Sequence, residues 1–77
     1  MNIRRQVGVN VRRYRNLRRW SQEKLGFESG LHRTYISGVE RGVRNPTVLV
    51  LFEIATALGV PTARLLDEKQ NSAVRFK

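Results

Sequence analysis

Two short helical patterns in residues 22–41, separated by a glycine, constrain the fold of this chain more than any other feature. The first pattern covers about 22–28 and follows Ser21, a favourable N-cap residue. Gly30 adopts positive φ at little cost and therefore breaks this helix. The second pattern covers about 32–41. Helices this short depend on packing against other elements, so the pair predicts a compact helical domain.

The remaining periodic segments also predict helices. They are residues 3–18, residues 48–58 after Thr47 as N-cap, and a short last helix at about 62–67. In the first of them, the expected buried stripe consists of Ile3, Val7, Val11, Tyr14 and Leu17. No segment alternates with period two, so the sequence predicts an all-α domain of five helices.

The length of 77 residues allows one domain, which we place at residues 1–68, followed by a short polar tail at 69–77. The chain has no cysteine and one histidine, so we expect no metal site and no cofactor. It also has no long apolar run and no signal peptide, which favours a cytoplasmic protein without membrane contact.

The net charge of +9 lies almost entirely in residues 1–44. A charge of this size on a small domain indicates a polyanionic partner, with nucleic acid as the first candidate and an anionic membrane as the second. There is no paired-carboxylate, nucleophile or glycine-rich phosphate motif, so we expect neither an enzyme nor a small-molecule ligand.

The residue types in 22–41 fit a helix-turn-helix, a motif in which the second helix enters the major groove. Gly26 provides a small residue where the two helices touch, and Gly30 provides the turn. Apolar residues expected to point into the angle between the helices are Leu25, Leu31, Ile36 and Val39. Facing outward we expect Thr34, Ser37, Gly38 and Arg41, with Arg33 at the edge.

Several motifs resemble the phage-repressor-type (Cro/C1, XRE-like) helix-turn-helix family over about residues 7–66. They are SQEKL at 21–25, GLHRTYIS at 30–37, ERG at 40–42, NPT at 45–47 and ALGV at 57–60. The octapeptide at 30–37 is similar in particular to the restriction–modification controller proteins. The resemblance implies a lambda-repressor-like fold and a small dimeric regulator that binds inverted-repeat operators, including that of its own operon.

Base readout is assigned to three residues of the second helix. Arg33 has the geometry to donate two hydrogen bonds to guanine O6 and N7, and the other two residues are Thr34 and Ser37. Gly38 stands on this face without a side chain, so we expect specificity to depend on these three residues and on DNA shape.

Phosphate contacts are expected from Gln22, His32, Tyr35, Arg41, Arg44 and Asn45. Gln22 starts a helix, where backbone N–H groups favour anions, and the family resemblance implies that it also braces the recognition helix. Tyr35 fits a half-buried core position equally well. Arg44 has the alternative of entering the minor groove of a bent site.

The resemblance also implies a structural ion pair between Arg15 and Glu40, which fixes how the first and third helices dock. The segment 48–58 is apolar nearly all round, and in so small a domain the spare surface favours a homodimer. The expected interface consists of Leu49, Val50, Phe52, Leu65 and Leu66, which Val74 and Phe76 of the tail could join. The alternative is that these residues complete the core of the monomer.

Taken together, the sequence predicts a sequence-specific dimeric regulator that binds double-stranded DNA through the helix at 32–41. Two alternatives remain. One is a protein-interaction module with the same fold, antitoxin- or antiactivator-like, which the apolar segment 48–58 keeps open. The other is a basic peptide that binds RNA or membranes through its arginine-rich first helix.

Overall fold

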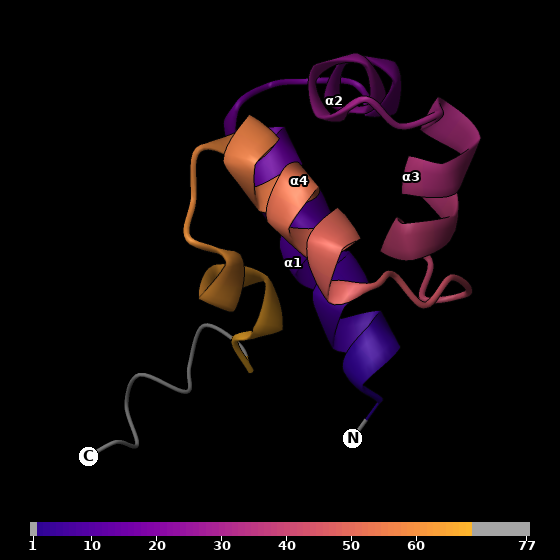
Figure 1. The fold of residues 1–77 in the computed structure, drawn as a ribbon, viewed down its shortest axis with the longest axis vertical. Helices are drawn as coiled ribbons and strands as arrows, with labels where there is room; N and C mark the ends of the chain where they lie inside the picture. The colour runs from indigo at the N-terminus through magenta and orange to yellow at the C-terminus, as the bar shows by residue number, and fades with distance from the viewer. Residues whose placement is uncertain (1, 69–77) are drawn as a thin grey trace.

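The computed structural model describes residues 2–68, and every regular element in this part of the chain is helical. The elements are α1 (Ile3–Leu17), α2 (Gln22–Ser29), α3 (Arg33–Glu40), α4 (Val48–Leu58) and the 3-10 helix η1 (Thr62–Leu66), as Figure 1 shows. The all-α prediction is confirmed, with one correction: the last element is a 3-10 turn, so the described residues contain four α-helices and not five.

The tail at 69–77, with Val74 and Phe76, lies outside the described residues. The domain boundary at residue 68 therefore stays a prediction.

Side-chain caps explain where the helices begin. Ser21 Oγ accepts a hydrogen bond from the backbone N–H of Lys24 at 2.9 Å, and Thr47 Oγ1 accepts one from Val50 at 3.1 Å. Both N-caps were predicted from the sequence. Gly30 ends α2 with φ of 77°, in the left-handed region that glycine adopts without strain.

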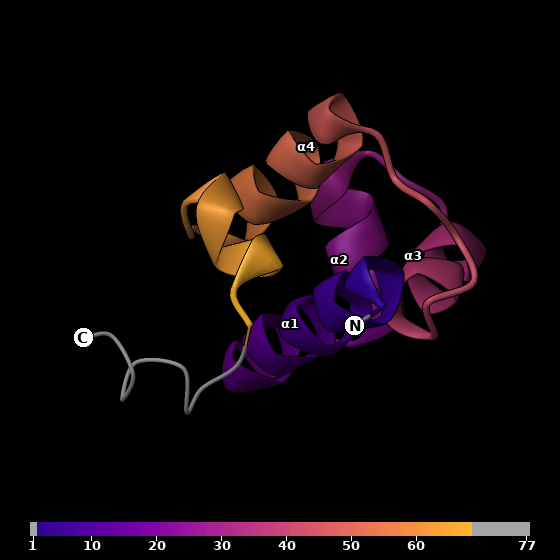
Figure 2. The same ribbon diagram turned by 90° about the horizontal axis from the view of Figure 1, so that it is seen from below.

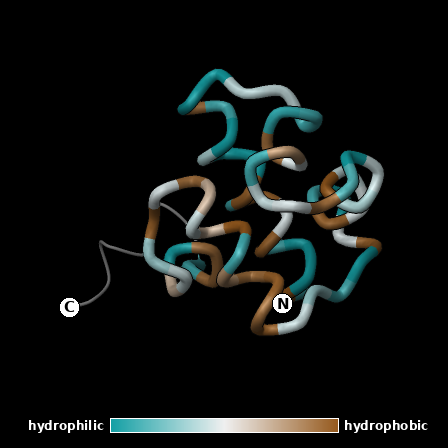
Figure 3. Tube along the Cα trace, turned by 45° about the horizontal axis from the view of Figure 1, so that its top comes forward, coloured by the Kyte–Doolittle hydropathy of each residue, from teal (hydrophilic) through white to brown (hydrophobic). Residues whose placement is uncertain are grey.

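The helices surround one core. Helix α1 packs against α3 on one side and against η1 and α4 on the other, while α2 contacts both α3 and α4 (Figures 1 and 2). The tube in Figure 3 changes between hydrophobic and hydrophilic colour along the chain, as amphipathic helices around a single core require. The buried apolar residues are Val7, Val11, Leu25, Ile36, Val39, Leu51, Ile54, Ala55, Leu58 and Leu65.

The buried stripe predicted for α1 included two residues that are exposed. Val7 and Val11 are buried and Tyr14 packs against the core, but Ile3 and Leu17 are exposed. These two residues lie at the first and last positions of α1.

Leu65 also requires a correction, because it is 0% exposed and belongs to the core of the monomer. Asn10 explains its position: this nearly buried side chain donates from Nδ2 to the backbone oxygens of Leu65 at 2.9 Å and Asp67 at 2.8 Å. These bonds hold η1 against α1 and satisfy backbone carbonyls that the short helix leaves unpaired. Leu65 therefore has no surface to offer to a dimer interface.

Candidate nucleic-acid interface

The connection between α2 and α3 is tight. The backbone N–H of Leu31 donates to the carbonyl oxygen of Gly26 at 2.8 Å, so the chain turns back directly over α2. A Cβ atom on Gly26 would lie 2.6 Å from the carbonyl oxygen of Leu31, which leaves no room for a side chain. The small residue and the turn that the sequence predicted for a helix-turn-helix are both present.

The outer face of α3 carries the residues predicted to contact bases. Arg33 and Thr34 are exposed, and Ser37 is half-buried one turn further along. Arg41 follows the helix and extends its Nε towards Ser37 Oγ, at 3.4 Å. The fold thus brings Arg33, Thr34, Ser37 and Arg41 to one side of α3, opposite the buried Ile36 and Val39.

His32 lies outside α3 and not within it, because the helix begins at Arg33. His32 is the N-cap: its Nδ1 accepts a hydrogen bond from the backbone N–H of Thr34 at 3.1 Å. The same Nδ1 lies 2.8 Å from the hydroxyl oxygen of Thr34.

The expectation that Gly38 stands open on this face was wrong. Gly38 is buried, and a Cβ atom on it would lie 2.6 Å from Cγ of Arg44. The backbone N–H groups of Val43 and Arg44 both donate to the carbonyl oxygen of Gly38, at 3.0 and 3.3 Å, which folds the loop back onto α3. The Arg44 side chain therefore occupies the space that a larger residue at position 38 would fill.

Tyr35 completes this arrangement. It is half-buried against the core, and the guanidinium carbon of Arg44 lies 5.7 Å from the centre of its ring, within the range of a cation–π contact. Asn45 is exposed on the same loop.

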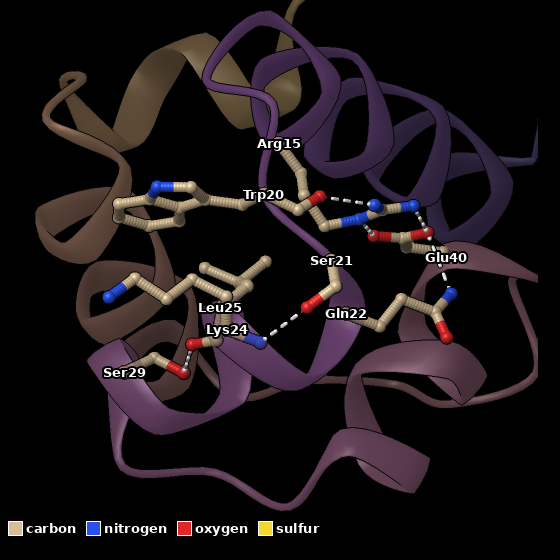
Figure 4. A network of polar contacts seen from close by, with 8 residues as sticks. All are labelled: Arg15, Trp20, Ser21, Gln22, Lys24, Leu25, Ser29 and Glu40. Atoms are coloured by element: carbon tan, nitrogen blue, oxygen red, sulfur yellow. Dashed lines mark hydrogen bonds and ion pairs between the residues drawn. The ribbon is translucent and has the colours of Figure 1, made fainter.

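A buried polar network lies behind α3 and fixes its far end (Figure 4). Arg15 donates to both carboxylate oxygens of Glu40, from Nε at 2.6 Å and from Nη2 at 3.0 Å, and from Nη1 to the carbonyl oxygen of Trp20 at 2.7 Å. Gln22 donates from Nε2 to the same carboxylate at 3.0 Å. The expected Arg15–Glu40 ion pair is present, with Gln22 as a brace between α2 and the end of α3.

The network also sets the charge of the outer face. Glu40 is the only acidic residue in α3, and its carboxylate is turned inward and paired. The exposed side chains around α3 thus include Arg33, Arg41 and Arg44 with no acidic residue of α3 among them. The face is positive and carries hydrogen-bond donors, as a surface for phosphates and base edges requires.

Comparison with known proteins identifies this architecture. A helix-turn-helix family model, HTH_3, matches residues 11–65. This chain belongs to that helix-turn-helix family.

Two relatives that are similar to this chain over most of their length are control proteins. Control protein C.SmaI of Serratia marcescens is 48% identical over 69 residues, which cover 90% of this chain and 82% of that protein. Control protein C.BamHI of Bacillus amyloliquefaciens is 51% identical over 67 residues, covering 86% of this chain and 83% of that protein. The resemblance to controller proteins seen in the octapeptide thus extends through the domain.

A solved structure of a related controller protein is similar in fold as well. The restriction–modification controller protein C.Esp1396I, a tetramer in complex with its natural 35 base-pair operator, matches with a TM-score of 0.77 and 34% identity. The match covers 84% of this chain and 86% of that chain.

A second surface of this helix-turn-helix domain is apolar. Val48, Leu49 and Phe52 lie on the outer side of α4, and Leu49 and Phe52 are 63% and 55% exposed. We call these three residues the exposed α4 face. Of the other predicted interface residues, Leu66 is exposed and Val50 is half-buried against the core.

No group of three potential metal-ligating side chains occurs within residues 2–68. In the same part of the chain, no helix is both long and apolar enough to cross a membrane.

Two features of the structure were not predicted from the sequence. Nothing in the local sequence pattern around Asn10 indicated that its side chain holds η1 in place. The packing of Arg44 against Gly38 did leave a signal: a glycine within a helix, where it costs about 1 kcal/mol relative to alanine, usually has a packing reason.

Proposed function

We propose that this protein is a dimeric transcriptional regulator that binds an inverted-repeat operator, as a restriction–modification controller protein does, and regulates its own operon. The observation that carries the proposal is the positive outer face of α3. It presents Arg33, Thr34 and Ser37 together, while Arg15 and Gln22 hold the end of the helix in place through Glu40. The membership in the helix-turn-helix family supports it, as do the control proteins among its relatives.

Base readout falls to the first turns of α3, which would enter the major groove. Arg33 is exposed at the first position of the helix, where a recognition helix approaches base edges. Its guanidinium can donate two hydrogen bonds to guanine O6 and N7. Thr34 and Ser37 are the other two residues that we assign to base contacts.

Phosphate contacts would surround this helix. The Gln22 amide has two N–H donors and donates one of them to Glu40. The other N–H is available to a phosphate at the start of α2. The other residues assigned to phosphates are His32, Tyr35, Arg41, Arg44 and Asn45. The position of Arg44 against α3 favours a contact in or beside the major groove over the alternative of a minor-groove insertion.

The exposed α4 face would form the homodimer. It is an apolar surface on a soluble domain, and contact with a second copy would remove it from water. A two-fold axis through this interface would place the two α3 helices about 34 Å apart, one turn of DNA. Leu49 and Phe52 are the principal contacts in this arrangement, with Leu66 and Val50 at its margins.

A regulator of this kind acts in the cytoplasm and catalyses no reaction, and the control proteins to which it is similar are regulators. Affinity for DNA should fall steeply with salt concentration, because phosphate contacts by Arg and Lys release condensed counterions.

The decisive experiment is selection of binding sites from random duplex DNA at about physiological ionic strength. An enriched inverted repeat, with half-sites about one helical turn apart, would support the proposal. A pool without enrichment, with binding only at low salt, would contradict the proposal. The positive face of α3 would then attract DNA without sequence preference. Capture of one protein in place of DNA would favour the interaction-module alternative.

A further inference from the structure

The His32 imidazole and Thr34 meet through two hydrogen bonds at the same ring nitrogen. Nδ1 of His32 lies 3.1 Å from the backbone nitrogen of Thr34 and 2.8 Å from its hydroxyl oxygen. Both residues are exposed at the start of α3, on the side assigned above to DNA.

The backbone contact fixes the tautomer of the ring. A backbone N–H can only donate, so Nδ1 has to hold a lone pair and the proton of the neutral imidazole has to sit on Nε2. An imidazole with its proton on Nδ1 would place two donors against each other and leave the start of α3 without a cap. The hydrogen bond that caps α3 therefore selects the Nε2–H tautomer.

The tautomer in turn fixes the direction of the second hydrogen bond. Because Nδ1 has no proton to give, the Thr34 hydroxyl is the donor in its contact with His32. A threonine hydroxyl has one hydrogen and two lone pairs. With its hydrogen used by His32, Thr34 can offer DNA a hydrogen-bond acceptor and a methyl group.

We propose that His32 is a positioning residue that sets the hydrogen-bonding polarity of Thr34, so that Thr34 contacts an A·T pair in the major groove. Adenine N6 supplies a donor that an acceptor can meet, and the thymine of the same pair supplies a methyl group for the Thr34 methyl. When guanine replaces adenine, the acceptor O6 stands where N6 offered a donor, and Thr34 in this state cannot satisfy it. The one major-groove donor of that pair, cytosine N4, lies on the opposite base, and the pair has no methyl group. Phosphates are excluded as partners of the Thr34 hydroxyl for the same reason, since they too require a donor.

The inference about the tautomer stands alone, whereas the inference about A·T preference rests on the proposed function. His32 is the only histidine in the chain, so the two nitrogen-15 chemical shifts of its ring can be assigned without ambiguity in the free protein. We expect Nδ1 to have the shift of an unprotonated nitrogen and Nε2 that of a protonated one. A ring protonated on Nδ1, or one that averages both tautomers, would overturn the inference whether or not the protein binds DNA.

The second test uses four variants on the selected operator and on operators in which each A·T pair is exchanged for G·C, with guanine in the place of adenine. Thr34→Val keeps the shape and loses the hydroxyl, and Thr34→Ser keeps the hydroxyl and loses the methyl. His32→Asn retains a side-chain oxygen acceptor that caps the helix, and His32→Ala removes it. Melting temperatures of the free variants identify any loss that is only due to unfolding.

We expect Thr34→Val to reduce discrimination at one A·T pair by about five- to tenfold and to leave the other positions unchanged. His32→Ala should shift the preference at that same pair towards G·C, because the freed hydroxyl can donate, and His32→Asn should retain the wild-type preference. Thr34→Ser should keep part of the preference.

If Thr34→Val lost the same affinity for every sequence, the Thr34 hydroxyl would be a donor to phosphate and the proposal would be overturned. A His32→Ala variant with unchanged base preference would also overturn it. A wild-type protein that prefers no sequence would instead contradict the proposed function, and the ring-nitrogen shifts would still report on the tautomer.

Discussion

Arg15 of α1 and Glu40, the last residue of α3, form a two-point ion pair that is almost completely shielded from water. The Nε–Oε2 distance is 2.6 Å, and the two side chains are 11% and 3% exposed. Both oxygens of the carboxylate are engaged, because Gln22 and Nη2 of Arg15 share the second one. The direction of α3 thus depends on a residue that points away from the outer face proposed to bind DNA.

Removal of Arg15 should destabilise the domain strongly. Arg15→Ala leaves the Glu40 carboxylate buried without its main partner, which costs about 3–5 kcal/mol in the free energy of unfolding. Urea denaturation followed by circular dichroism measures the loss. Lys24→Ala is the matched control, because it breaks the exposed Lys24–Glu28 pair, and such surface pairs contribute about 0–1 kcal/mol. Equal effects of the two variants would show that the Arg15–Glu40 pair is not a buried constraint.

Arg33 should contribute to sequence specificity and not only to nonspecific attraction between the protein and DNA. Arg33→Ala is expected to weaken binding to the selected operator by about 1–3 kcal/mol and binding to random DNA much less, because only the operator offers the guanine edge. Arg12→Ala, on the exposed side of α1, removes the same charge and should weaken both in equal proportion. Fluorescence anisotropy at one fixed salt concentration compares them. If Arg33→Ala weakened both DNAs equally, Arg33 would be a phosphate contact.

Leu49 should be needed for self-association. Leu49→Arg places a charge in the exposed α4 face, where a second copy would have to bury it, so the dimer should dissociate to monomers. Phe27→Arg is the control, because Phe27 is 80% exposed on α2, and this substitution should leave the dimer intact. Sedimentation equilibrium reports the mass of each variant. A dimer that survives Leu49→Arg would place the interface elsewhere.

Gly38 should act on DNA through Arg44. Gly38→Ala introduces a Cβ atom 2.6 Å from Arg44 Cγ, and the flexible side chain of Arg44 can move aside while the fold is kept. Alanine is the better helix former, so thermal stability should not fall. The affinity for the operator should fall in Gly38→Ala and in Arg44→Ala, and the double variant should lose no more than Arg44→Ala alone. Additive losses would mean that the two positions act independently.

The local sequence was sufficient to predict the helix ends that are set by capping and turn residues. Ser21 and Thr47 begin helices, Gly30 ends one, and all three act where the pattern placed them because caps and turns depend on neighbouring residues. The outer face of α3 was also predictable, since helical periodicity separates Ile36 and Val39 from Arg33 and Thr34. The family motifs added the Arg15–Glu40 pair, which no local pattern encodes.

The residues whose burial was wrongly predicted depend on the elements that pack against them. Leu17 and Leu65 are both apolar residues near the end of an element, yet Leu17 is exposed and Leu65 is fully buried. Leu65 is buried because η1 packs against α1 and α4, whereas Leu17 lies beside Val9, Arg13 and Asn16 on the outward side of α1. Gly38 looked open from the sequence, and only the loop that follows α3 shows that Arg44 covers it.

The sequence by itself determined the helical class of this protein, the two-helix unit at 22–41, its positive charge and the residue types offered to DNA, because periodicity, caps and charge are properties of neighbouring residues. Tertiary structure alone decided which apolar residues are buried and where Arg44 lies. Burial is set by contacts between groups that are distant in the chain, and these contacts form only when the helices pack.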